Sequence, residues 1–321
     1  MPAPRILVAY DGSDEAAAAI RAAGRLFPGA HAVVANARGD AVALEHAALA
    51  RIAVPDAVIA PSAAAYEREA ETASWTIAER GCSIAHESGL DGTATSSEGS
   101  SAWRAICAAG REHAADVIAC GTRGLGGVGR ALLGSTSSAL VHHADRPVLV
   151  VPPEAGELEG PILIGYDGSD GAKVAIRCAA RLFPGRATLV VHSWTAAVAS
   201  SFAGETMLNA PVAEIRDVAS DIEDAFAEQA DATAAEGAAL AVAHGLRARG
   251  LAIPSDLGAW RTLAKAGRGE GAAVVIAGCR GRGAIASTVL GSVSSGLVHN
   301  ASVPVLIVRD GHSITEGDVT R

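Results

Sequence analysis

The sequence predicts an α/β protein with two tandem domains, each built around a doubly wound parallel sheet. One observation is a repeat: ILVAYDGSD at Ile6–Asp14 returns as ILIGYDGSD at Ile162–Asp170. A second repeat follows at nearly the same separation, GTRGLGGVGRALLGSTSS at Gly121–Ser138 and GCRGRGAIASTVLGSVSS at Gly278–Ser295. This separation is far longer than a solenoid repeat, which indicates two copies of one domain.

The first copy alternates between strand and helix patterns. Ile6–Tyr10 is a short apolar run, as expected of a strand covered on both faces. The alanine-rich segment Asp14–Leu26 follows a Gly-Ser turn and predicts a helix. The remaining strands are expected at Val33–Ala37, Ser83–His86, Val117–Cys120 and Val148–Val151, and the remaining helices at Ser62–Arg80, Ser101–His113 and Ser135–His143.

The second copy predicts the same order of elements. After its first strand and helix, strands are expected at Leu189–Ser193, Leu240–Ala243, Val274–Ala277 and Val305–Val308, and helices at Ile215–Glu236, Asp256–Gly267 and Ser292–Asn300. Strict alternation of strand and helix implies parallel strands joined by right-handed crossovers. Each copy is therefore predicted to be a doubly wound α/β sandwich.

The length agrees with this division, since 321 residues exceed what one core usually serves. PPEAGELEG, at Pro152–Gly160, is acidic and rich in Pro and Gly, which suits a linker. The predicted organisation is a first domain at 1–152, a linker at 153–160, a second domain at 161–309 and a polar tail at 310–321.

Composition argues against several classes of function. No apolar stretch approaches the roughly 20 residues of a membrane span, and the start MPAPRILVAY resembles a strand more than a signal peptide, so we expect a cytoplasmic protein. The net charge of −9 and the absence of a Lys/Arg cluster argue against binding to nucleic acid. The five cysteines show no CxxC spacing, which favours reduced thiols over disulfides or a metal site.

Residues suited to an anionic ligand fall where the winding of each sheet reverses, the usual place for a ligand in this architecture. Asp11 and Asp167 end the first strands, and a loop of spacing Gly-x2-Gly-x9-Gly-Ser follows each fourth strand. The glycines let the backbone approach a phosphate, and the last Gly-Ser opens a helix whose N–H groups attract an anion. The loops also supply the charges of Arg123 and Arg280 and the hydroxyls of Ser135, Thr136, Ser137, Ser138, Ser292, Ser294 and Ser295.

Simpler interpretations of these motifs stay open. Glycine turns also serve only to reverse the chain, and YDGSD is a good helix start in which Asp or Ser caps the first turn. Capping by Ser13 and Ser169 is compatible with an Asp that faces the cleft. The formal GxGxxG at Gly124–Gly129 does not follow a first strand and loses its third glycine in the second copy, and neither loop has the lysine of a Walker motif.

The strand ending in Asp, the glycine spacing and the final Pro-Val-rich strand resemble the universal stress protein family in its tandem form, over nearly the whole chain. The resemblance implies two five-stranded parallel sheets of the adenine nucleotide alpha hydrolase-like, Rossmann-like type, with ATP at the strand ends and Mg²⁺ accompanying it. It implies adenine contacts from Asp11, Ala37, Asp167 and Ser193, ribose and phosphate contacts from Gly121, Gly124, Gly278 and Gly281, and a cradle for the phosphate tail from Gly134, Ser135, Thr136, Ser137, Gly291, Ser292, Val293 and Ser294.

This sequence departs modestly from the family's pattern. The family often has Val where Ala37 and Ser193 stand, and the two loops differ, with Leu125 and Arg130 in one facing Arg282 and Ser287 in the other. Both sites are therefore expected, but not with equal affinity.

Catalytic residues are not predicted. No Ser/His/Asp set or metal-spaced carboxylate pair recurs in both copies. His142 aligns with His299 at the end of a helix, where a cation complements the dipole, and Cys279 in one loop is replaced by Thr122 in the other.

The sequence thus favours an ATP-binding stress or growth regulator whose two nucleotide sites are sensed by a protein partner or by assembly. The alternative is a slow ATPase or nucleotidyl-transfer enzyme that uses the same clefts, and a third is a scaffold with vestigial pockets. The closing strands lie at the sheet edges of the inferred winding, so we expect them to pair antiparallel. One chain would then imitate a dimer, and a homodimer of chains is a further expectation.

Overall fold

The computed structural model describes residues 3–39, 56–124, 133–195, 212–255, 258–281 and 290–309. Internal contacts divide the chain into two units, Met1–Ala155 and Gly156–Arg321, with the boundary inside the stretch expected to be a linker. The expected tail at 310–321 and the loop positions Leu125, Gly126, Gly129, Arg130, Arg282 and Ser287 lie outside the described residues.

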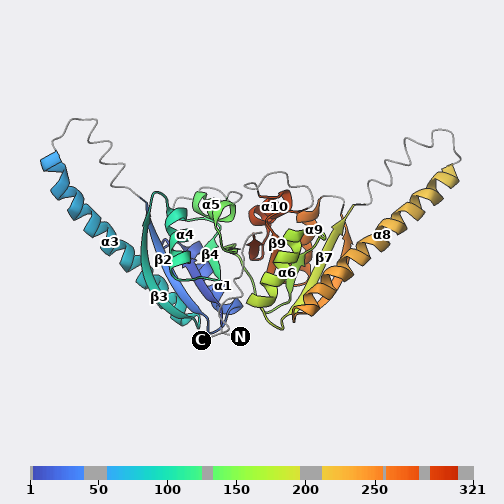
Figure 1. Ribbon diagram of the computed structural model, residues 1–321, viewed down its shortest axis with the longest axis horizontal. Coiled ribbons are helices and arrows are strands. Elements are labelled where there is room, and N and C mark those ends of the chain that lie inside the picture. Colours follow the sequence, from blue (N-terminus) through green and yellow to red (C-terminus); the bar gives the residue numbers. More distant parts are fainter. Residues whose placement is uncertain are drawn as a thin grey trace. The chain divides into compact units, whose positions relative to one another are not determined.

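The first unit alternates strand and helix along its length (Figure 1). Its elements are β1 (Arg5–Ala9), α1 (Asp14–Leu26), β2 (His31–Gly39), α3 (Asp56–Glu87), β3 (Asp91–Gly99), α4 (Ala102–Glu112), β4 (Val117–Gly121), α5 (Ser135–His143) and β5 (Val148–Val151).

The second unit repeats this order. Its elements are β6 (Ile162–Gly165), α6 (Asp170–Leu182), β7 (Ala187–Trp194), α8 (Val212–Ala243), β8 (Arg247–Pro254), α9 (Ala259–Gly269), β9 (Val274–Gly278), α10 (Ser292–Asn300) and β10 (Val305–Val308).

Each unit contains a five-stranded parallel sheet, which confirms the predicted fold class. The strand order is β3-β2-β1-β4-β5 in the first unit and β8-β7-β6-β9-β10 in the second. In the first unit Val8 is paired with Val34 on one side and Ala119 on the other. The winding reverses between β1 and β4, and between β6 and β9, so the carboxyl ends of these strands are the expected ligand position.

Helices cover both faces of each sheet. In the first unit α1 packs beside α3, and α4 packs beside α5 on the other face, with α6 and α8 matching α1 and α3 in the second. Helix α3 lies against β2 and β3, and its N-terminal part extends beyond the sheet (Figure 1). The central strand β1 is covered on both faces, since Ile6, Leu7 and Val8 are fully buried, as its apolar run predicts.

The predicted strands at Ser83–His86 and Leu240–Ala243 are wrong. Both segments are the last turns of long helices, α3 and α8, and the third strand of each sheet comes later, as β3 and β8. A four-residue apolar run is consistent with either a buried helix turn or a strand. Here Cys82 and Ala85 are buried against the sheet from the helix, so the apolar signal belonged to α3.

The five cysteines are free thiols, and all are buried. In the part of the chain that the structure describes, no helix is both long and apolar enough to span a membrane.

Candidate functional site

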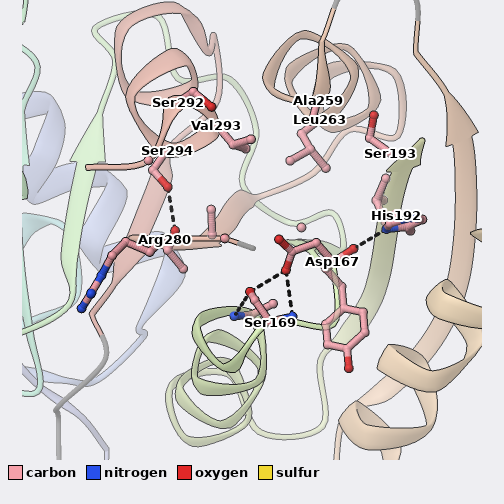
Figure 2. A pocket seen from close by; sticks show the side chains of 18 of the residues that line it. Asp167, Ser169, His192, Ser193, Ala259, Leu263, Arg280, Ser292, Val293 and Ser294 are labelled. Carbon is pink, nitrogen blue, oxygen red and sulfur yellow. Dashed lines mark hydrogen bonds between the residues drawn. The ribbon is translucent and has the colours of Figure 1, made fainter. Parts of the chain in front are cut away.

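Each unit has a cleft at the carboxyl ends of its central strands, where the winding reverses. The first cleft has a volume of about 420 Å³ and is bounded by the ends of β1, β2 and β4 and the starts of α1, α4 and α5. The second has a volume of about 580 Å³ and is bounded by the corresponding elements (Figure 2).

The structure brings the predicted site residues of each unit to the same cleft, except Ser138 and Ser295, whose hydroxyls were suggested for the anion but which line neither cleft. The first cleft is lined by Asp11, Ala37, Gly121, Arg123, Gly124, Gly134, Ser135, Thr136 and Ser137. The second is lined by Asp167, Ser193, Gly278, Arg280, Gly281, Gly291, Ser292, Val293 and Ser294. Residues from the first strand, the second strand and the glycine loop thus converge, although they are far apart in sequence.

The aspartate at the end of each first strand is tied to the helix that follows. Asp11 Oδ1 accepts hydrogen bonds from the main-chain N–H of Ser13 at 3.0 Å and from its hydroxyl at 2.6 Å. Ser13 is the N-cap of α1, and its Oγ accepts from the N–H of Ala16 at 3.2 Å. The capping residue is therefore Ser13, and Asp11 orients the cap while also lining the cleft.

The second unit reproduces this arrangement (Figure 2). Asp167 Oδ1 accepts from the N–H of Ser169 at 3.0 Å and from its hydroxyl at 2.5 Å, and Ser169 Oγ caps α6 by accepting from Ala172 at 3.3 Å. Capping by serine and a cleft-facing aspartate therefore coexist in both units.

The first two glycines of each loop stand where a side chain would collide with its neighbours. A Cβ at Gly124 would overlap Asp11 Oδ2, and one at Gly281 would lie 2.6 Å from Asp167 Oδ2. A Cβ at Gly121 would lie 2.8 Å from the main chain of Glu15 in the first turn of α1. Close packing thus accounts for part of the glycine pattern without any ligand.

The helix after each glycine loop begins without a side-chain cap. The N-cap residues of α5 and α10 are Gly134 and Gly291, neither of which makes a side-chain cap. The Ser137 hydroxyl instead donates to the carbonyl of Gly121 at 2.7 Å, and that of Ser294 donates to Gly278 at 2.6 Å. These hydroxyls anchor the helices to the strand ends, so their single donors are engaged within the protein.

Several lining residues were not predicted. Ala102 and Ile106 of α4 line the first cleft, and Ala259 and Leu263 of α9 line the second. The tripeptide AWR occurs at the start of both helices, at Ala102–Arg104 and Ala259–Arg261, and this repeat could have marked them. The other lining residues not predicted are Ala9, Tyr10, Ala16, Ala35, Cys120, Gly165, Tyr166, Ser169, Ala172, Val191, His192, Ala277 and Leu290.

Cys120 lines the first cleft. Cys279 and the aligned histidines His142 and His299 are not among the lining residues of either cleft. Burial raises the pKa of the Cys120 thiol to about 12, which keeps it protonated and unreactive. His142 lies in the last turn of α5, and His299, in the last turn of α10, has its Nδ1 2.8 Å from the Ser295 carbonyl. These positions agree with the helix-end interpretation.

Comparisons with known proteins match both units of this chain to one family. The model of the universal stress protein family matches residues 3–152 and 160–309. A universal stress protein of Mycolicibacterium smegmatis is 30% identical over 207 residues, and one of Mycobacterium tuberculosis is 32% identical over 200 residues. These matches span 61% and 60% of this chain but only 62% and 58% of the relatives' lengths.

A universal stress protein from Archaeoglobus fulgidus gives a TM-score of 0.57 at 15% identity, over 97% of this chain and 100% of that one. At this identity the similarity shows the fold alone.

Proposed function

Since this chain belongs to the universal stress protein family, we propose that it is a cytoplasmic regulator that binds ATP in both clefts. Nucleotide occupancy would be sensed by a protein partner or by assembly. The observation that carries the proposal is a contrast between the two helix starts that meet at each cleft, those of α1 and α5 in the first unit.

The start of α1 is capped, because the Ser13 hydroxyl accepts a hydrogen bond from the N–H of Ala16 in its first turn. The N-cap residue of α5 is Gly134, and within the described part of the chain no side chain caps the first N–H groups of this helix. Unsatisfied N–H groups and the positive end of the helix dipole favour an anion. Arg123 is among the residues that line the same cleft, and it carries a fixed positive charge. The second cleft has the same contrast between α6 and α10, beside Arg280.

A nucleoside triphosphate suits this distribution of groups. Its phosphates would lie at the start of α5 or α10, and its base and ribose would extend along the strand ends past Asp11 or Asp167. Charge-assisted hydrogen bonds contribute about 1.5–3 kcal/mol each, so a few of them would support micromolar binding after the entropic cost.

Mg²⁺ fits these clefts only as a companion of the phosphates. Among the described lining residues each cleft has one carboxylate, Asp11 or Asp167, and one of its oxygens already accepts two hydrogen bonds. Mg²⁺ commonly binds through one or two carboxylates together with substrate phosphates. We therefore expect Mg²⁺ to arrive with ATP.

Nucleotide extracted from the purified protein tests this proposal. Mass analysis should find ATP, and the ATP should stay intact during hours of incubation with Mg²⁺. Accumulating ADP or AMP would instead support the slow ATPase or nucleotidyl-transfer alternative. If no nucleotide co-purified and added ATP did not bind, the clefts would be vestigial.

A further inference from the structure

The starts of α9 and α10 lie together at the second cleft. The lining residues that these two helices contribute are Ala259, Leu263, Ser292, Val293 and Ser294. Figure 2 shows both groups on the same side of Asp167. The N-cap residue of α9 is Gly258, which has no side chain to cap the helix, and α9 packs against α10 and the strands β7 and β9. The first turn of α9 thus takes its position from packing and not from a cap.

Trp260, in the first turn of α9, packs against the main chain of α10 at Gly296. A Cβ at Gly296 would overlap Cγ of the Trp260 ring and would lie 2.6 Å from its Cδ1 and Cδ2 atoms. The guanidinium carbon of Arg261 lies 4.4 Å from the centroid of the same ring. The ring approaches α10 this closely because Gly296 has no side chain, and in a close-packed contact an added methyl group would displace the ring or the helix.

The first unit has the same tryptophan but a different contact. Ala139 stands at the position of Gly296. Trp103 stacks on His143, in the last turn of α5, with ring centroids 4.9 Å apart and an angle of 29° between the ring planes. The counterpart of His143 is Asn300, whose amide donates back to the Gly296 carbonyl at 2.8 Å. The two units therefore join the same pair of helices through different side chains.

The contact between Trp260 and Gly296 lies close to the groups proposed to bind the anion. Trp260 directly follows Ala259, which lines the cleft, and Gly296 lies one turn after Ser292, the first residue of α10. A shift of about 1 Å at this contact would misalign the N–H groups of α10 with a phosphate, because hydrogen bonds weaken steeply away from their preferred distance and angle.

We propose that Trp260 is a positioning residue of the second cleft, and that its contact with Gly296 holds the start of α10 where its N–H groups meet the phosphates of a nucleotide. Trp260 is not among the residues that line the cleft, so it acts through α10. This inference rests on the proposed function, that the second cleft binds a nucleoside triphosphate. Its consequence is that a pair of residues outside the second cleft controls the affinity of that cleft alone.

The test adds a methyl group at the contact and measures the second cleft by itself. Every chain carries Gly124→Val, which blocks the first cleft because a side chain there collides with Asp11. Calorimetry then gives the dissociation constants of ATP and of inorganic tripolyphosphate. Gly296→Ala should weaken both ligands by about fivefold to tenfold, an effect of the size found for residues in direct contact. Tripolyphosphate should lose as much affinity as ATP, because the change acts on the phosphate end of the site.

A smaller side chain at position 260 should remove the effect of the added methyl group. Trp260→Leu leaves room for it, so in this background Gly296→Ala should weaken ATP by less than about twofold. Trp260→Leu alone deletes the contact without a collision and should weaken ATP by about threefold. If Gly296→Ala did not fold, Trp260→Leu and the double variant would still decide, since a Trp260→Leu chain that bound ATP as its parent does would contradict the inference.

Two controls separate positioning from stability. Ile176→Val removes one methyl group from a fully buried side chain of the second unit that does not line the cleft, so it should lower the melting temperature and leave the affinity for ATP unchanged. Ala139→Gly, made with Gly281→Val to isolate the first cleft, changes the corresponding position of the first unit. It should leave ATP affinity unchanged, because Trp103 packs on His143.

The outcomes are distinguishable. If Gly296→Ala lowered the melting temperature but kept the affinity for ATP, or if Trp260→Leu did not relieve its effect, the contact would serve packing alone. This inference would then be wrong and the proposed function would stand. If neither ATP nor tripolyphosphate bound the chain in which Trp260 and Gly296 are intact, the proposed function would fail, and this inference with it.

Discussion

Asp11 and Ser13 are joined by two hydrogen bonds to one carboxylate oxygen, from the Ser13 N–H at 3.0 Å and from its hydroxyl at 2.6 Å. The same hydroxyl caps α1. One oxygen of Asp11 thus serves the fold, while Oδ2 sits beside Gly124 in the cleft. The pair Asp167 and Ser169 repeats this relationship in the second unit.

Replacing these aspartates should affect binding more than stability. In the double variant Asp11→Ala with Asp167→Ala, we expect ATP to bind more weakly, with a smaller loss for GTP, because the aspartates are proposed to contact adenine. Loss of the carboxylate that supports each N-cap serine should lower the free energy of unfolding by about 1 kcal/mol. Calorimetry with both nucleotides and thermal unfolding measure the two effects.

Ser13→Ala with Ser169→Ala is the matched control. It removes the caps at a similar cost in stability but keeps both carboxylates. It should therefore leave the preference for ATP over GTP intact. Equal losses of ATP and GTP affinity in the aspartate variant would mean that Asp11 and Asp167 serve the fold alone.

The glycine loops provide a test of the number of sites. Gly124→Val or Gly281→Val should each remove one ATP per chain, because a side chain there collides with Asp11 or Asp167. Gly269→Val is a control, since nothing lies within 4 Å of a Cβ at that position. Titration should give one site for each loop variant and two for the control. A Gly124→Val chain that still bound two ATP would contradict the assignment of the first cleft.

The sequence predicted those parts of the fold whose signal is local. β1 and β4 are apolar runs buried on both faces, and α1 begins at a serine cap, so in each case the local pattern agrees with the element that forms. The third strands were missed because β3 is DGTATSSEG, a polar segment at the edge of its sheet with no buried residue among its nine. An edge strand with little buried surface leaves no apolar pattern to detect.

The site was predictable to the extent that it repeats. The repeated glycine spacing identified most of the loop residues that line the clefts, and of the described loop residues it missed Leu290. That His192 lines the second cleft could not be predicted, because its counterpart Asn36 is buried in the first unit. The two residues differ in the side chains that pack behind their strands. Such packing depends on residues distant in sequence, such as Ser74.

The raised pKa of the Cys120 thiol leads us to expect that the protein becomes less stable at alkaline pH. Burial raises its pKa from 9.0 to about 12, so the folded state retains a proton that the unfolded state loses first. The protonated thiol therefore costs the folded state nothing below pH 9.0. Between pH 9.0 and about 12 the free energy of unfolding falls, because only the unfolded state releases the proton. Cys120→Ala should therefore lose less stability than the parent across this range, as measured by denaturant unfolding at several pH values.

The same burial predicts that Cys120 resists alkylation at neutral pH until the protein unfolds. Rapid native-state labelling of Cys120, or identical alkaline profiles for parent and variant, would show that the thiol is accessible to solvent.

The last strands of the two units, β5 and β10, offer a test of how the units associate. β5 is the last strand of the first unit's sheet and β10 the last of the second's, and an unpaired edge strand is prone to association. We propose that the two edges pair antiparallel, so that one chain imitates a dimer. Leu149→Lys with Leu306→Lys should then lower the melting temperature and increase the hydrodynamic radius. A double variant that kept both values would contradict the edge-pairing proposal.

The central claim is that one chain holds two ATP sites, and calorimetric titration of the unmodified, nucleotide-free protein with ATP and Mg²⁺ tests it most directly. Because both units keep the aspartate, the glycine loop and the uncapped helix, the account predicts a stoichiometry of two ATP per chain. A stoichiometry of one, or no binding, would contradict it.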